Sequence, residues 1–271
     1  MDMLWQESKQ TNNATFYLGC SHLNWFKYLD VPVMVSRRLI HTRKSLPIAT
    51  ERWVLDSGGY GQLHRHGEWT FTPEQYAKEC KRYADEMGNL EWVAPMDWMC
   101  EPSARQETGL SVAEHQKRTL ENFLYLRQLL GELVIPVLQG WEYDDYQRCV
   151  DMFDKAGIDL TKERCVGLGS VCRRDAKKEI CDIVYSLQPI RLHAFGVKGS
   201  AYIELAHMLE SADSTAWSME ARWKPSRPEC NHPTMNCRSA HCYNYATYWL
   251  RKLERKKHWH QEQQLFQLAF A

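Results

Sequence analysis

The stretch Trp53-Val54-Leu55-Asp56-Ser57-Gly58-Gly59-Tyr60 decides the fold that we expect for this chain. Its first residues are apolar and suit a buried β-strand, and its two glycines free the backbone for a tight turn that a ligand can approach closely. Asp56 would then lie at the carboxyl end of a strand, above a cleft. The alternative is a surface turn in which Asp56 only caps its own backbone. The first interpretation is favoured because the same pattern recurs along the chain.

Seven further segments have the composition of short buried strands, and helical periodicity or helix starts separate most of them. These segments are Thr15–Gly19, Val33–Val35, Glu91–Asp97, Leu133–Leu138, Arg164–Ser170, Ile190–Gly196 and Ser211–Ser214. Helices are expected at residues 73–87, 111–130, 143–156, 175–187 and 200–209. Strands that alternate with helices form parallel sheets, and eight of them predict an α/β fold, a (β/α)8 TIM barrel. Pro136 argues against a central place for its strand, because proline has no N–H for the ladder.

The composition is that of an ordinary soluble globular protein, with 271 residues of which 44% are hydrophobic and 25% are charged. No apolar run approaches the roughly eighteen residues that a membrane-spanning helix requires, and the N-terminus lacks the pattern of a signal peptide. We therefore expect no membrane partner and a cytoplasmic location, which would be the host cytoplasm if a virus encodes the protein.

Carboxylates end three of the predicted strands. In TIM barrels the carboxyl ends of the strands build the active site, and Asp56, Asp97 and Asp213 fall at three such ends. Like charges in one cleft raise each other's pKa and so distinguish acid, base and nucleophile, and carboxylate pairs of this kind carry out substitution at an anomeric carbon. In an arbitrary barrel such residues are as often helix caps, so the pattern alone leaves both interpretations open.

Other strand ends supply groups that suit a flat ligand. Gln139 offers an amide donor and an acceptor, and the glycines at 167 and 169 let the backbone come close. Tyr60 and Phe195 are candidates to sandwich a ring, because a base stacked on an aromatic side chain gains roughly 1 to 3 kcal/mol. Together these groups predict a pocket for a nucleobase edge. Packing in the core is the alternative for the two aromatic residues.

The motifs at these strand ends resemble, in order and spacing, the signatures of the tRNA-guanine transglycosylase superfamily. They lie at residues 56–60 (DSGGY), 95–97 (PMD), 138–140 (LQG), 166–171 (VGLGSV), 195–197 (FGV) and 212–214 (ADS). The similar region spans roughly residues 50 to 260. The resemblance implies a (β/α)8 barrel with a zinc-binding insertion or extension, in agreement with the strand pattern.

The resemblance also implies a role for each site residue. Asp213 would be the nucleophile that attacks C1′ of the sugar and displaces guanine, and Asp56 would be the general base that takes a proton from the incoming deazaguanine. Asp97 and Gln139 would read the Watson–Crick side of the base, and the backbone at Gly169 would donate to its carbonyl oxygen. The expected substrate-binding residues are Ser57, Tyr60, Asp97, Gln139, Gly140, Gly167, Gly169 and Phe195.

Cysteines and histidines cluster near the C-terminus, with three thiols and two imidazoles between residues 230 and 242. Three cysteines and one histidine are a common ligand set for structural Zn2+. The expected ligands are Cys230, His232, Cys237 and Cys242. His258 and His260 are alternatives to His232, and free thiols are the alternative to a metal site.

The same region is basic. Residues 222 to 260 carry nine Lys or Arg and two Glu, a local charge of +7 in a chain whose formal net charge is zero. This uneven distribution of charge favours a basic surface that binds a polyanion. The alternative is a helix surface whose charged side chains only face solvent. The zinc site would anchor a helix from Tyr243 to Lys257 that contacts phosphates. The expected contacts are Arg251, Lys252, Arg255, Lys256 and Lys257.

These features divide the chain into a catalytic barrel at residues 1–221 and a zinc-binding, basic helical extension at residues 222–271, packed on the barrel. Two branches of the superfamily fit, one that modifies tRNA and one, the 7-deazaguanine DNA transglycosylases (DpdA-like), that exchanges guanine in DNA for a base such as preQ0. Three features are similar to the DNA branch: the loose spacing of the cysteines, the end of the chain shortly after the zinc region, and the segment Asp213 to Trp217.

We therefore expect a guanine transglycosylase that acts on DNA through a covalent glycosyl-enzyme, with a free 7-deazaguanine base as the second substrate. tRNA is the alternative polymer. A zinc-stabilised nucleic-acid-binding barrel without catalysis is an alternative of a different class, and a glycoside hydrolase is another. Both a monomer and a homodimer fit the sequence.

Overall fold

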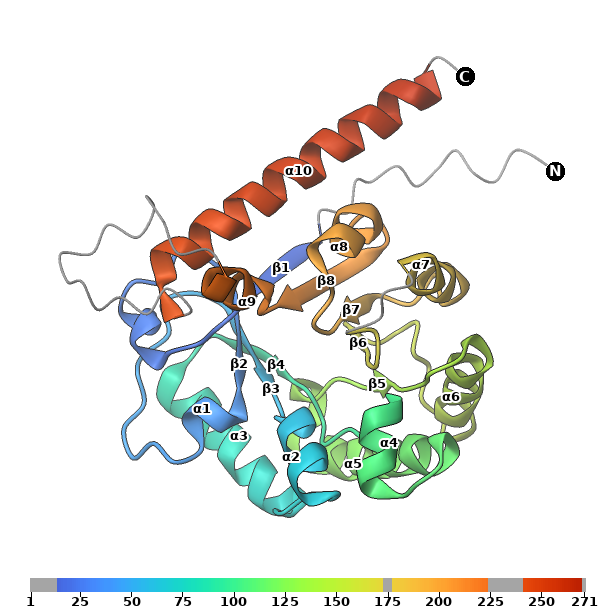
Figure 1. The fold of residues 1–271 in the computed structure, drawn as a ribbon. Coiled ribbons are helices and arrows are strands. Elements are labelled where there is room, and N and C mark those ends of the chain that lie inside the picture. The colour runs from blue at the N-terminus through green and yellow to red at the C-terminus, as the bar shows by residue number, and fades with distance from the viewer. Residues whose placement is uncertain (1–13, 173–176, 224–240, 270–271) are drawn as a thin grey trace.

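The computed structural model describes residues 14–172, 177–223 and 241–269. In these ranges the chain forms an α/β fold in which eight parallel strands make one curled sheet (Figure 1). The strands are β1 Thr15–Gly19, β2 Val33–Ser36, β3 Trp53–Asp56, β4 Leu90–Val93, β5 Val137–Leu138, β6 Val166–Leu168, β7 Leu192–Ala194 and β8 Leu209–Ser214. Their order, β4-β3-β2-β1-β8-β7-β6-β5, is the cyclic order of a TIM barrel cut between β4 and β5, so the fold is TIM-like.

The two edges of the curled sheet lie next to each other. One parallel bridge joins Val93 of β4 to Val134, and the N–H of Ile135 donates to the carbonyl of Val93 at 3.2 Å. Pro136 follows and has no N–H to extend this ladder, which explains why β5 is only two residues long. The strand expected over 133–138 was therefore too long, and its first part continues a 3-10 turn at Gly131–Leu133.

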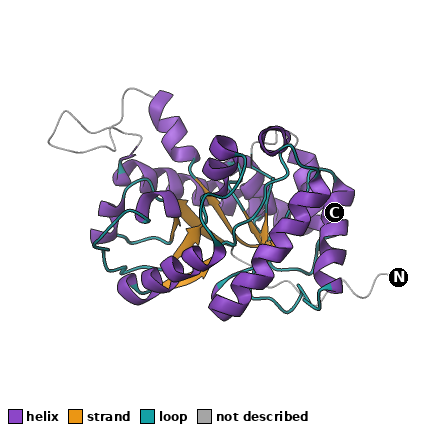
Figure 2. Cartoon of the chain, turned by 90° about the horizontal axis from the view of Figure 1, so that it is seen from below, coloured by secondary structure: helices purple, strands orange, loops and turns teal. Residues whose placement is uncertain are grey.

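Helices cover the outside of the sheet, as Figures 1 and 2 show. The five that were predicted are α3 Pro73–Met87, α5 Val112–Leu130, α6 Tyr143–Lys155, α7 Lys177–Ser186 and α8 Gly199–Leu205. Each begins within a few residues of the predicted start, because the local signals are strong: Thr72 accepts from the N–H of Gln75, and the Gln75 side chain bonds back to the N–H of Thr72. Neighbouring helices of this series pack against each other around the sheet.

Four further helices, of at most eight residues each, come after strands and were not predicted. They are α1 Arg37–Ile40 after β2, α2 Gly59–His66 after β3, α4 Pro102–Thr108 after β4, and α9 Ala216–Trp223 after β8. Because they follow strands, they lie at the carboxyl end of the sheet, where α2 packs against α4. Gly58 makes the turn into α2 with a φ of +83°, a left-handed conformation that favours glycine.

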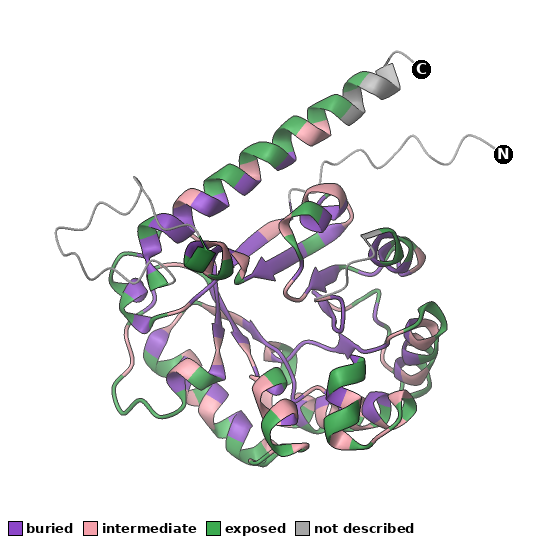
Figure 3. Cartoon of the chain, viewed as in Figure 1, coloured by how far each residue is buried: buried purple, intermediate pink, exposed green. Residues whose placement is uncertain are grey.

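The core of the described residues has three clusters, and side chains that alternate along the strands contribute to two of them. Figure 3 shows the strands largely buried, and the exceptions include Glu210 of β8, which is exposed. Phe16 and Leu18 of β1 belong to the large cluster that joins the sheet to the helices, whereas Tyr17 between them belongs to a smaller cluster. That smaller cluster consists of Tyr17, Met34, Val54, Trp92, Ile135 and Cys165, with Phe195 packed against it. It fills the inside of the curled sheet.

The last helix, α10 Tyr243–Ala269, packs its first half on α8, α9 and β1, and then projects away from the barrel (Figure 1). Tyr243, Trp249 and Leu253 of α10 belong to the same hydrophobic core as the strands. The boundary expected between residues 221 and 222 falls inside α9, so the described part of the extension continues the barrel's core. No helix among the described residues is long and apolar enough to cross a membrane.

Candidate active site

The carboxyl ends of three strands bring Asp56, Asp97 and Asp213 close enough to influence one another. Asp56 ends β3, Asp97 follows β4, and Asp213 lies near the end of β8. The charge of Asp213 raises the pKa of Asp56, and the charge of Asp56 in turn raises the pKa of Asp97. Asp56 therefore interacts electrostatically with both Asp213 and Asp97, and all three carboxylates stand at the carboxyl end of the sheet.

Asp56 has a pKa above the ordinary range of an aspartate, and burial is the main cause. The charge of Asp213 acts in the same direction. Hydrogen bonds from the Ser36 side chain and the Gly58 N–H oppose the shift, as does the charge of Arg38. A raised pKa favours the protonated form of a carboxyl group, which is the form that donates a proton.

Asp97 is held by two side chains from other strand ends. Burial, with the charge of Asp56 second, raises the pKa of Asp97 to about 7. The Nε2 of Gln139 donates to its Oδ2 at 2.5 Å, and the Ser57 hydroxyl lies 3.4 Å from its Oδ1. The carboxylate is thus fixed in orientation at the mouth of the barrel.

We expect this shift to make stability depend on pH. The pKa of Asp97 is about 7 in the folded protein, against an ordinary value of 3.8, so the folded state binds more protons than the unfolded chain between these two values. The stabilising contribution is complete below about pH 4 and is lost as the pH rises through about 7. Urea unfolding of the wild type and of Asp97→Asn at about pH 4.5, 6 and 8 measures this. The wild type should lose stability relative to the variant as pH rises, and parallel pH curves would contradict the assignment.

Gln139 is oriented by a buried polar network that the sequence did not reveal. The Ser170 hydroxyl donates to Gln139 Oε1 at 2.7 Å, accepts from the N–H of Cys100 at 2.7 Å, and lies 3.1 Å from Oε2 of Glu101. The hydroxyl has one proton for two acceptors, so it can turn between Gln139 and Glu101. Ser170 also has a φ of +56°, an uncommon value for a residue other than glycine. No motif identified Glu101, and only its proximity in the fold does so.

The glycines at the strand ends leave room for other side chains. A Cβ on Gly169 would lie 2.2 Å from Gln139 Nε2, one on Gly167 would lie 2.5 Å from the Phe195 ring, and one on Gly140 would lie 2.9 Å from Cβ of Asp145. The expected donor role of Gly169 does not fit, because its N–H already donates to the carbonyl of Leu138 at 2.9 Å. That N–H is part of the strand pairing, which a sequence motif cannot show.

Gly169→Ala should lower the free energy of unfolding by about 1 to 3 kcal/mol, because the new methyl group overlaps the hydrogen-bonded amide of Gln139. Gly61→Ala is the matched control, since its Cβ would meet only the guanidinium of the flexible Arg65, at 3.0 Å. Urea unfolding of both variants checks the difference. Equal stabilities would mean that Gln139 moves away without cost.

The two candidate stacking residues differ in setting. Tyr60, in the first turn of α2, is 41% exposed, and its ring lies 4.2 Å from the ring of His64. Phe195 follows β7 and is only partly buried, with edge contacts to Trp92 and His193 at 6.2 and 4.6 Å between ring centroids. Phe195 therefore closes the top of the inner core. Stacking on a base remains a prediction for both residues.

Asp213 is 6% exposed, and backbone and side chain together hold it. The N–H of Gly196 donates to its Oδ1 at 2.8 Å, and Nε2 of the buried His193 lies 3.4 Å from the same oxygen. Gly196 has a φ of +59°, so the glycine permits the turn that aims this N–H. His193 was not singled out from the sequence, because a histidine in an apolar strand gives no local signal of function.

The basic residues of α10 do not all face solvent. Arg251, Lys252, Arg255 and Lys256 are exposed, with Arg251 at 3.6 Å from Asp30. Lys257 was expected to contact phosphates as well, but it is 1% exposed, pairs with Glu254 and lies 3.3 Å from the hydroxyl of Tyr202. It stabilises the packing of α10 on α8, and that expectation was wrong.

Most of the expected zinc ligands lie outside the described residues. Cys230, His232 and Cys237 fall in the undescribed range 224–240. Cys242 is described and is 3% exposed, immediately before α10, whereas the alternatives His258 and His260 lie on α10. The described ranges contain no group of three or more metal-binding side chains.

The protein thus has a TIM-like α/β fold with Asp56, Asp97 and Asp213 at the carboxyl ends of three strands. The family model described as DpdA, DeoxyPurine in DNA protein A, matches residues 12–271, and the chain belongs to this family. The match confirms the predicted branch of the superfamily and points to a purine of DNA as the target. No curated protein matches the chain.

Proposed function

We propose that this protein exchanges guanine in DNA for a 7-deazaguanine base through a covalent glycosyl-enzyme. The observation that carries the proposal is the placement of Asp56, Asp97 and Asp213 at the carboxyl end of the sheet, in a member of a family described by deoxypurines in DNA. A nucleophile, an acid–base group and a base-reading carboxylate are the three roles that such an exchange requires.

In the first half of the reaction, a carboxylate oxygen of Asp213 attacks C1′ of the deoxyribose, and the C1′–N9 bond breaks with its electron pair going to guanine. Burial raises the pKa of Asp56 and so favours its protonated form, which supplies the proton that the leaving base takes up. In the second half the incoming deazaguanine gives a proton back to Asp56 and attacks C1′. The bond to Asp213 then breaks, and both carboxyl groups return to their starting states.

Asp97 and Gln139 would recognise the base. Their hydrogen bond at 2.5 Å holds them as one acceptor and donor pair at the mouth. A carboxylate accepts from the N1–H and the exocyclic amine of guanine, which adenine does not present together. The residues proposed to complete the pocket are Ser57, Tyr60, Gly140 and Phe195. A base in duplex DNA must be flipped out of the helix to reach this pocket.

The experiment that tests the proposal incubates the protein with labelled guanine and, separately, with duplex DNA, single-stranded DNA and tRNA. Label should enter DNA. Uptake by tRNA alone would transfer the proposal to the other branch of the superfamily, and uptake by none of the three polymers would favour a barrel that binds without catalysis. The exposed residues Arg251, Lys252, Arg255 and Lys256 are proposed to contact phosphates, so binding should weaken as salt rises.

A structural zinc is part of the proposal, because thiolates and imidazoles are the groups that Zn2+ prefers. The buried thiol of Cys242 fits this role, since it lies at the start of α10 and packs into the shared core. When bound, the metal would supply cross-linking and no chemistry. The proposed ligands are Cys230, His232, Cys237 and Cys242.

Elemental analysis of the purified protein should find about one zinc per chain. The Cys237→Ser, Cys242→Ser double variant should contain none, because two of four ligands are lost. A Cys149→Ser variant is the control, since this buried thiol lies in α6, far along the chain from the cluster. Zinc retained by the double variant would refute this ligand set.

A further inference from the structure

His193 lies inside the curled sheet, beneath the proposed nucleophile. It is the central residue of β7 and is fully buried. Aromatic rings enclose it, with centroids of Phe195, Trp92 and Tyr17 at 4.6, 4.8 and 6.0 Å. This packing fixes the plane of the imidazole and leaves its two nitrogens pointing along the inside of the sheet.

The two nitrogens of His193 have different partners. Nδ1 lies 2.8 Å from the hydroxyl of Ser211 in β8. Nε2 lies 3.4 Å from Oδ1 of Asp213, which is within ion-pair distance but does not meet hydrogen-bond geometry. No other polar atom of the described residues bonds this nitrogen, so a buried polar group is left facing the nucleophile alone. Such groups are rare because leaving them unpaired costs free energy.

The two oxygens of Asp213 are also distinct. Oδ1 faces both the Gly196 N–H at 2.8 Å and Nε2 of His193 at 3.4 Å, whereas Oδ2 has no hydrogen bond among the described residues. Donors on one oxygen hold a carboxylate in place and leave the lone pairs of the other available for attack. The geometry thus distinguishes Oδ1, which its neighbours hold in place, from Oδ2, which is available to react.

We propose that His193 is a positioning residue for Asp213: its Nε2–H donates to Oδ1, while the Ser211 hydroxyl fixes the imidazole in this tautomer. The inference rests on the proposed function, since it assigns Oδ2 of Asp213 as the atom that bonds C1′. A shift of a few tenths of an ångström would bring the 3.4 Å contact between Nε2 and Oδ1 to ordinary hydrogen-bond distance.

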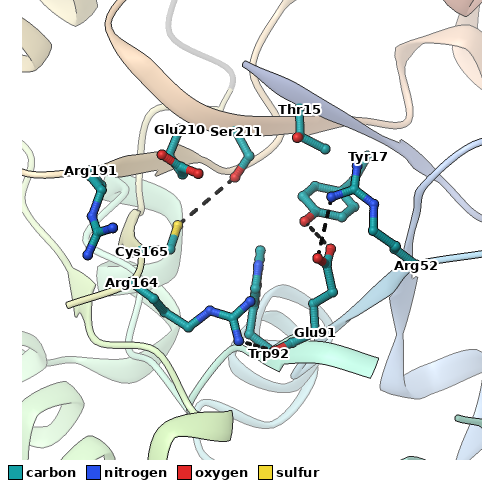
Figure 4. Close-up of a pocket in the computed structure, with 10 residues that line it drawn as sticks. All are labelled: Thr15, Tyr17, Arg52, Glu91, Trp92, Arg164, Cys165, Arg191, Glu210 and Ser211. Atoms are coloured by element: carbon teal, nitrogen blue, oxygen red, sulfur yellow. Dashed lines mark hydrogen bonds and ion pairs between the residues drawn. The ribbon is translucent and has the colours of Figure 1, made fainter. Parts of the chain in front are cut away.

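Ser211 contacts His193 and also lies at the end of the sheet opposite to the proposed active site. It lines a cavity of about 250 Å3 together with Tyr17, Cys165 and three arginines that lie before β3, β6 and β7. Figure 4 shows the Ser211 hydroxyl pointing into this cavity beside Cys165. Burial raises the pKa of the Cys165 thiol to about 12, so it stays protonated. The thiol lies 4.0 Å from the Ser211 hydroxyl and, being protonated, can donate to its oxygen, so the hydroxyl proton is available to Nδ1 of His193.

Three variants test the inference. His193→Phe keeps an aromatic ring in the cage but removes both nitrogens, and His193→Gln keeps a donor of similar reach. Formation of the covalent complex by His193→Phe should be slower by roughly tenfold to a hundredfold, with KM for DNA changed by less than about twofold, since removal of one preorganised donor acts on kcat. His193→Gln should recover part of the rate, and Ser211→Ala should show a smaller loss of the same kind.

Nitrogen NMR of the whole protein, with the His193 signals assigned from their absence in His193→Gln, reads the tautomer without any activity. We expect hydrogen on Nε2 in the wild type and a mixture of tautomers in Ser211→Ala. An imidazole with hydrogen only on Nδ1 would overturn the inference, and so would wild-type kcat in His193→Phe or, if that variant does not fold, in Ser211→Ala. Base exchange that survives in Asp213→Asn would instead refute the proposed function, so the two failures are distinguishable.

Discussion

Asp213→Ala should abolish the covalent complex with DNA and reduce base exchange by about 10^4-fold or more, because the reaction loses its nucleophile and not merely a binding contact. The fold should persist. Asp213 makes its hydrogen bond with one backbone N–H, and the other strands of the sheet do not depend on it. Denaturing gel electrophoresis of protein incubated with labelled DNA detects the complex, and thermal unfolding reports the fold.

Glu210→Ala is the matched control for this experiment. Glu210 is a carboxylate on the same strand, β8, but it is exposed near the amino end and lines the cavity opposite the mouth. Removal of this carboxylate should leave the rate of base exchange within about twofold of the wild-type rate, because substitutions at exposed positions usually have small effects. Exchange at a wild-type rate in Asp213→Ala would remove the nucleophile assignment. Equal losses in both variants would show a general effect of charge on DNA binding.

Asp97→Asn should lower kcat/KM for guanine by roughly 100-fold, since a hydrogen bond to a charged group contributes about 1.5 to 3 kcal/mol. The substitution should be tolerated by the fold. Rotation of the Gln139 amide would turn Oε1 toward the new side-chain amide at position 97 and Nε2 toward Ser170, whose hydroxyl can redirect its proton to Glu101 at 3.1 Å. The network then remains satisfied, but the acceptor that faces the base is lost.

The measurement compares incorporation of guanine with that of purines whose Watson–Crick edge differs, at a pH above 7 where wild-type Asp97 is mainly ionised. Glu101→Gln is the control variant, because it alters the far end of the same hydrogen-bond network and leaves the carboxylate of Asp97 in place. This variant should reduce kcat/KM for guanine by less than Asp97→Asn does. An unchanged base preference in Asp97→Asn would refute the reading role of this residue.

Much of the architecture followed from local patterns. Apolar segments with turn residues after them located all eight strands, and the capping signals at Thr72 and Ser111 located two helices to within a residue. The strand-end motifs identified the carboxylates, and the family was predicted from their order and then confirmed. Helices of at most eight residues show little periodicity, so α1, α2, α4 and α9 were missed, although α8, of seven residues, was found.

The sequence by itself determined the order of the elements and the strand ends at which Asp56, Asp97 and Asp213 stand, because strand and helix periodicity and turn chemistry act between near neighbours in the chain. The tertiary structure alone decided that Ser170 and Glu101, 69 residues apart, orient Gln139, that the Gly169 N–H is used within the sheet, that Lys257 is buried, and that His193 faces Asp213. Those relations depend on burial and on atoms brought together from distant segments. Neither burial nor contacts between distant segments can be predicted from neighbouring residues. The same side chain has a different pKa and different partners according to what the fold packs around it.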